Sequence, residues 1–213
     1  NTLLGAKAGD ALTTGQENVA IGYEALSTED GNGTNVAVGW GTLKVQNAGT
    51  SAYSTAVGYS AGIAITTGAR NTLVGGLAGD ALTTGEENVA IGYLALSAED
   101  AHGYNTAVGT YALRAQDAGA SAFNTALGYY VGYNVTTGIK NTLIGSYAGN
   151  NITTGSYNIA LGHSALQTED THGYNTAIGF EALKTQNAGA NTYNTAVGYQ
   201  AGTAMTTGVE NTI

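Results

Sequence analysis

The sequence predicts an all-β fold, a parallel β-solenoid (β-roll) of about twelve coils with roughly 17–19 residues each. A five-residue motif recurs along the chain: Asn (once Ser), Thr or Val/Ile, Ala or Leu, Val/Ile/Leu, then Gly. Successive motifs begin at Asn1, Asn18, Asn35 and Ser54, and the same series restarts at Asn71 and at Asn141. A short fixed period indicates stacked units that contact mainly their neighbours. Gly and turn residues interrupt the chain too often for the long helices of helical repeat proteins.

The repeat predicts one domain over residues 1–213, built from cycles 1–70, 71–140 and 141–210, with 211–213 beginning a further repeat. The chain starts without Met at a motif boundary and stops inside a motif, so we expect a fragment of a longer chain. Coils that rise about 4.8 Å each would form a rod on the order of 60 Å long.

Each motif alternates as a β-strand requires. In residues 88–92, Val89 and Ile91 point to one face, while Ala90 and Gly92 point to the other. We expect both faces to be buried, as in a parallel coil that packs on a second layer or on a neighbouring chain. A second short segment such as Ala95-Leu96 follows each motif, so each coil is expected to contain strand, turn, strand and turn.

The first residue of the motif predicts a side-chain ladder, because stacked Asn residues can donate and accept hydrogen bonds along the solenoid axis. We expect this ladder to close turns and to do no chemistry. Its members are Asn1, Asn18, Asn35, Asn71, Asn88, Asn105, Asn124, Asn141, Asn158, Asn175 and Asn194.

Composition excludes several classes. With 33 Gly but no Pro, and with Gly not at every third position, the chain is not collagen. The absence of Cys excludes disulfides and leaves the redox compartment open. A formal charge of −9 without a basic stripe argues against nucleic-acid binding. No apolar run reaches membrane-spanning length, so we expect no membrane insertion.

The motif at residues 18–22 and 88–92, with its Asn-Thr-Ala-Val-Gly-Tyr variants, resembles the head repeats of trimeric autotransporter adhesins of the YadA type. It is more similar still to the Asn-Thr-Ala-x-Gly-Tyr-x-Ala-Leu arrays of phage tail fibres. The resemblance covers the whole chain. It implies a left-handed parallel β-roll with three chains side by side on a cell or virion surface. The coils depart from those of the adhesin head, whose repeats are shorter.

The repeated polar residues argue against a unique catalytic site, so we expect no enzyme, no cofactor and no metal site. A divalent cation could use carboxylate and imidazole ligands in two equivalent loops, with a solvated loop as the favoured alternative. The first cycle has Asn32 in place of His. The candidate ligands are Glu99, Asp100, His102, Glu169, Asp170 and His172.

Aromatic residues follow the motif Gly in most coils, and His163 takes that place in one of them. We favour packing for this column over a strip that binds sugars. Tyr53, Phe123 and Tyr193, one in each of the longer coils, are the candidates for ligand contact.

These features predict a structural segment of an extracellular fibre or filament, such as the shaft or head of a tail fibre or adhesin. Its partners would be copies of itself, as a homotrimer and in an end-to-end fibre. The alternative is an adhesin that binds a cell-surface glycan or protein receptor through the loops of the longer coils. Ice binding by the Thr columns is a third hypothesis, disfavoured because Val or Ile interrupts these columns and the coils are unequal.

Overall fold

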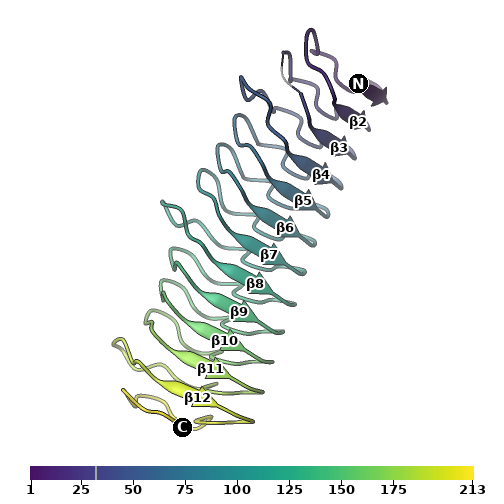
Figure 1. Cartoon of the computed structure of the whole chain (residues 1–213). Coiled ribbons are helices and arrows are strands. Elements are labelled where there is room, and N and C mark those ends of the chain that lie inside the picture. Colours follow the sequence, from purple (N-terminus) through teal and green to yellow (C-terminus); the bar gives the residue numbers. More distant parts are fainter. Residues whose placement is uncertain (32) are drawn as a thin grey trace. The chain divides into compact units, whose positions relative to one another are not determined.

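The computed structural model describes residues 1–31 and 33–213, and it confirms the predicted all-β parallel solenoid (Figure 1). The described residues contain no helix. The chain divides into two compact units, Asn1–Tyr104 and Asn105–Ile213. This division does not follow the three sequence cycles, and the expectation of a single domain stays a prediction.

Each coil contributes one strand of three residues, which are the second to fourth residues of the motif. In the first unit the strands are β1 (Thr2–Leu4), β2 (Val19–Ile21), β3 (Val36–Val38), β4 (Thr55–Val57), β5 (Thr72–Val74) and β6 (Val89–Ile91). In the second unit they are β7 (Thr106–Val108), β8 (Thr125–Leu127), β9 (Thr142–Ile144), β10 (Ile159–Leu161), β11 (Thr176–Ile178) and β12 (Thr195–Val197).

Within each unit every strand pairs in parallel with the strand of the next coil, and equivalent motif residues lie opposite one another. Ala20 is paired with Ala37, for example, and Ile21 with Val38. Figure 1 shows the strands of each unit stacked in chain order. The longer coils keep this register, because their two extra residues lie outside the strand.

The expectation of a second strand in each coil is wrong. The segment after the motif forms turns, and its residues include left-handed backbone such as Leu26 (φ 51°) and Leu96 (φ 51°). A β-strand needs an extended backbone with negative φ. The segment still bonds from coil to coil, since the Leu26 N–H donates to the Thr42 carbonyl at 3.0 Å.

The central residue of the motif faces the core. Ala20, Ala90 and Ala160 are fully buried there, and the Leu residues of the turn segments fill the space beside them. Where a turn segment carries Gly instead of Leu, larger neighbours compensate. A Cβ added at Gly79 would lie 2.7 Å from a methyl group of Leu82 and 2.9 Å from one of Leu73. The core volume is therefore shared between strand and turn positions.

The other two strand residues of each coil form what we call the outer face. Within the described chain no second layer covers this face, and its burial against a neighbouring chain stays a prediction. Ile91 is 37% exposed, Leu127 47% and Val197 58%. None of the twelve strands carries a charged residue. The outer face of each unit is thus an uncharged, half-exposed surface.

Candidate functional site

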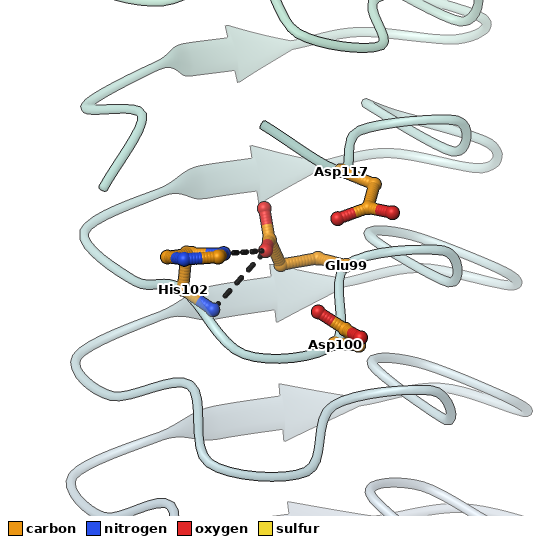
Figure 2. A group of neighbouring side chains, drawn as sticks. All are labelled: Glu99, Asp100, His102 and Asp117. Carbon is orange, nitrogen blue, oxygen red and sulfur yellow. Dashed lines mark hydrogen bonds and ion pairs between the residues drawn. The ribbon is translucent and has the colours of Figure 1, made fainter. Parts of the chain in front are cut away.

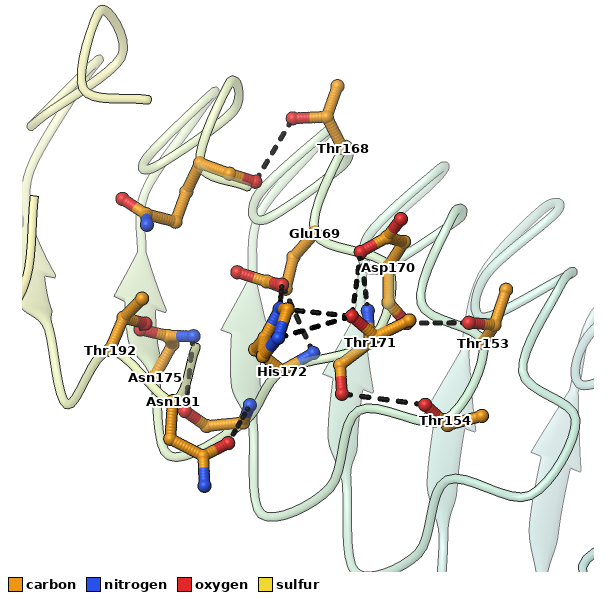
Figure 3. Close-up of polar contacts among 12 residues, drawn as sticks. Thr153, Thr154, Thr168, Glu169, Asp170, Thr171, His172, Asn175, Asn191 and Thr192 are labelled. Atoms are coloured by element: carbon orange, nitrogen blue, oxygen red, sulfur yellow. Dashed lines mark hydrogen bonds and ion pairs between the residues drawn. The ribbon is translucent and has the colours of Figure 1, made fainter. Parts of the chain in front are cut away.

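The Glu-Asp-x-His loop of the second unit lies just before β11 and is fixed by the coil that precedes it. The carbonyl oxygen of Asp170 accepts a hydrogen bond from the Thr153 hydroxyl at 2.8 Å (Figure 3). The backbone N–H of Thr154 also donates to this oxygen, at 3.2 Å. The position of the loop is therefore set by the Thr-Thr-Gly turn of the neighbouring coil.

Glu169 is fully buried in this loop, with an exposed fraction of 0%. Its Oε1 accepts a hydrogen bond from the backbone N–H of His172 at 3.2 Å and lies 3.4 Å from Nδ1 of the same residue (Figure 3). Its Oε2 is buried and has no hydrogen-bond partner. Burial raises the pKa of the Glu169 carboxyl, an effect that the His172 backbone hydrogen bond and the nearby imidazole only partly offset.

Asp170 and His172 complete the group. The ligand atoms of Glu169, Asp170 and His172 all lie within 4.8 Å of one another. The hydroxyl of Thr171 lies 3.1 Å from Asp170 Oδ1 and 3.0 Å from His172 Nδ1, so it connects the carboxylate to the imidazole. The structure thus brings together the three residues that the sequence singled out here.

The equivalent loop of the first unit repeats the contacts between Glu and His. The His102 N–H donates to Glu99 Oε1 at 3.2 Å, and His102 Nδ1 lies 3.5 Å from that oxygen (Figure 2). Nδ1 is buried and makes no hydrogen bond. The ligand atoms of Glu99, Asp100 and His102 also lie within 4.8 Å of one another.

Sequence reasoning missed that the Glu of these loops is buried. Glu29, the counterpart in the first cycle, is fully buried as well, and Asn32 lies outside the described residues. A solvated loop was the favoured interpretation because one cycle has Asn32 in place of His and the ligand set is incomplete. Charged residues are in addition seldom fully buried. The available signal was the recurrence of Glu at residues 29, 99 and 169, in step with the core positions.

The Asn side chains bond from coil to coil. The N–H of Asn158 donates to Asn141 Oδ1 at 2.9 Å, and the N–H of Asn141 donates to Asn124 Oδ1 at 2.8 Å. Asn141 Nδ2 donates to the Gly155 carbonyl at 2.9 Å and so fixes the turn of the next coil. The side-chain amides of Asn124, Asn141 and Asn158 are buried and hydrogen-bonded to backbone groups. They are therefore not available to a ligand.

The ligand-contact candidates lie on the surface. Tyr53 is 62% exposed, Phe123 50% and Tyr193 54%. The Tyr193 ring stacks on Tyr174 with centroids 5.0 Å apart, and Tyr174 stacks on Tyr157 at the same distance. Stacking on both sides covers the faces of the Tyr174 ring, so its exposed part is mainly its edge.

A second aromatic column borders the outer face. In the second unit His163 stacks on Phe180, and Phe180 on Tyr199, each pair with centroids 5.4 Å apart. In the first unit Trp40 lies 5.1 Å from Tyr59 and 6.1 Å from Tyr23. The rings pack along the column, yet they stay exposed, with 42% for Trp40. Together with the outer face they form an extended surface of Thr, aliphatic and aromatic side chains.

No family model, curated protein sequence or solved structure matches the chain. Within the described part of the chain, no helix has the length and apolar character needed to cross a membrane.

Proposed function

We propose that the chain is a structural segment of an extracellular fibre on a cell or virion surface, in which copies pack side by side through the outer face. In this role the chain has no catalytic function. The observation that carries the proposal is the outer face itself. It repeats an uncharged, half-exposed pair of strand residues in coil after coil, next to stacked aromatic rings.

The composition of this surface supports another copy of the chain as its occupant. The cores of protein interfaces are depleted in charge and enriched in aromatic residues, as this face is. Two or three copies in the same orientation would present the same residue types to one another at the same coil spacing. The negative net charge of −9 would then stay on the loops, where it limits lateral clumping.

Placing a charge on the outer face tests this proposal. Ile91→Lys and Leu161→Lys together put one ammonium group on the outer face of each unit, at side chains that are 37% and 41% exposed. We expect self-association to weaken at least about a hundredfold, since burying an unpaired charge costs several kcal/mol. Sedimentation equilibrium measures the association, and circular dichroism checks that the fold is retained.

Ala120→Lys with Ala190→Lys is the matched control, because both alanines are exposed loop residues away from the strands. These changes add the same charge and should leave assembly intact. The trimer expected from the resemblance predicts a mass of three chains for the wild type. A monomeric wild type at tens of micromolar, or unchanged assembly of the outer-face variant, would refute the proposal.

The second proposed function is an adhesin that binds a glycan or a surface protein. The exposure of Tyr53, Phe123 and Tyr193 at matching places in the three cycles favours it. A glycan array separates the two functions when it is probed with the wild type and with a variant in which Tyr53, Phe123 and Tyr193 are all replaced by Ala. Binding that depends on these rings supports the adhesin, and an array without signal for the wild type favours the purely structural segment.

A further inference from the structure

The buried carboxylate of Glu169 has less compensation than its burial requires. One oxygen accepts a single backbone N–H, and the other has no hydrogen-bond partner. An ionised carboxylate away from water normally needs several donors or a cation. The nearest cationic candidate is the His172 imidazole, at 3.4 Å from Oε1.

We propose that each of the two Glu-Asp-x-His loops binds one divalent transition-metal ion through Glu, Asp and His, as a site of Glu99, Asp100 and His102 and a site of Glu169, Asp170 and His172. The fully buried Oε2 of Glu169 has no hydrogen-bond partner, and a carboxylate that binds the ion through both of its oxygens satisfies it. This points to a ligand independently of the clustering of acidic residues.

The distances between the ligand atoms are compatible with a shared metal ion. The Nδ1 to Oε1 separations of 3.5 Å and 3.4 Å are longer than the usual range of about 2.7–3.2 Å for N–H···O bonds. Two ligands about 2.0–2.2 Å from a tetrahedral ion lie about 3.3–3.6 Å apart. The two loops reproduce this spacing in separate units, although residue 101 is Ala and residue 171 is Thr.

The donor set also indicates the class of ion. Imidazole is a ligand for Zn²⁺, Co²⁺, Ni²⁺ and Cu²⁺, whereas Ca²⁺ and Mg²⁺ take oxygen ligands. The imidazoles remain partly open, with side-chain exposures of 28% and 21%, so an ion can enter and keep a water molecule as fourth ligand.

Titration of chelator-treated chain with Zn²⁺ by isothermal calorimetry tests the inference. We expect two ions per chain. His102→Asn and His172→Asn should each reduce the number to one, and the double variant to zero. Asn is a suitable replacement because the first cycle carries Asn32 at this place in the repeat.

His163→Asn is the matched control, because His163 is the one remaining histidine of the sequence and stacks on Phe180. It should keep two ions. Circular dichroism of every variant verifies folding, and the absorption of bound Co²⁺ reports four-coordinate geometry. Absence of saturable Zn²⁺ binding would overturn the inference. Each loop would then contain a histidine–glutamate pair without a metal ion. It is also overturned if the double variant still binds two ions, or if Ca²⁺ at equal concentration displaces Zn²⁺.

Discussion

At the scale of single residues, the first and last positions of the motif depend on different physical properties. Asn at the first position has both a donor and an acceptor, so Asn158 can accept from the N–H of Asn175 while its Nδ2 donates to the His172 carbonyl. Gly at the last position has φ between 125° and 146°, a region that L-residues with a side chain avoid. Asn thus supplies hydrogen bonds, whereas Gly allows a positive φ and the close approach of the next coil.

Gly145→Ala should therefore be severely destabilising. A Cβ at this position would lie 2.6 Å from the Gly162 carbonyl oxygen, and the backbone has φ 125°. We expect a loss of at least about 3 kcal/mol in the free energy of unfolding, from strain and the clash together. Gly189→Ala is the control, since φ is 74° there and no atom lies within 4 Å of the added Cβ. Urea unfolding should show a loss of only about 1 kcal/mol for the control, and equal losses would contradict this account.

The single Ser in the Asn ladder offers a stabilising change. At the equivalent place in the second cycle, Asn124 Nδ2 donates to Gln116 Oε1 at 2.6 Å and to the Gly138 carbonyl at 2.8 Å. In the first cycle Ser54 cannot donate in this way, and Gln46 Oε1 is buried without a hydrogen bond. Ser54→Asn should raise the free energy of unfolding by about 1 kcal/mol, measured in urea. Ser54→Ala, which removes the hydroxyl that accepts from the Asn71 N–H at 3.4 Å, should lower it.

At the scale of elements, strands of three residues are too short to be stable alone. Each is held by the strands of neighbouring coils and by turn segments that bond along the same direction, as the Gly149 N–H does to the Ala165 carbonyl at 3.0 Å. The turns contain non-glycine residues with positive φ, each of which costs about 1–2 kcal/mol locally. Coil-to-coil hydrogen bonds and the buried Leu side chains offset this cost.

The loop before β11 should respond to pH through Glu169. Burial raises its pKa in the folded state, so its contribution to stability is greatest in acid and is lost as the pH rises through the folded pKa. In metal-free protein, Glu169→Gln should then raise the free energy of unfolding at pH 7 by on the order of 1 kcal/mol. The advantage over the wild type should shrink towards pH 4. Urea unfolding of both proteins in the presence of a chelator, at pH 7 and at pH 4, measures this difference. A variant that is less stable than the wild type at pH 7 would contradict the prediction.

The strands could be predicted from the sequence because one pattern gives both their position and their register. Ala20 and Ile21 lie on opposite faces of the strand, as the alternation indicates, and the structure shows that Ala20 faces the core. The turn conformation could not be predicted in the same way, because Leu26 looks like an ordinary strand residue. A signal was present, since Gly9 and Gly79 occupy the repeat position that Leu26 and Leu96 occupy in other coils. The occurrence of both Leu and Gly at this repeat position is consistent with a backbone of positive φ there. It is also consistent with a core volume that this position shares with the neighbouring strand residue.

The candidate site was predictable in its members but not in its environment. The shared spacing of Glu, Asp and His placed Glu169, Asp170 and His172 in one loop, and the structure holds them together. Whether Glu169 is buried depends on how the coils stack around its side chain, which the alternation of strand residues does not reveal. The same applies to the outer face, whose exposure depends on what lies beyond the chain.

At the scale of the whole molecule, stability should be close to a sum over coils and their interfaces, because each coil bonds mainly to the next one. The sequence repeats in cycles of four coils, so deletion of one whole cycle should preserve the contacts between coils. Removing residues 71–140 joins Arg70 to Asn141, which matches the Lys140–Asn141 junction of the intact chain. Every remaining motif keeps its neighbours of the same type.

The shortened chain should therefore fold. We expect the circular dichroism per residue to be unchanged and the urea m-value to fall in proportion to length, since m follows the surface exposed on unfolding. Removing residues 71–132 stops short of a whole cycle and is the matched control. It places turn residues where the next strand should begin, so equivalent residues no longer lie opposite one another. Equal stability of the two shortened chains would show that the period does not determine the packing, whereas loss of structure only in the control would show that it does.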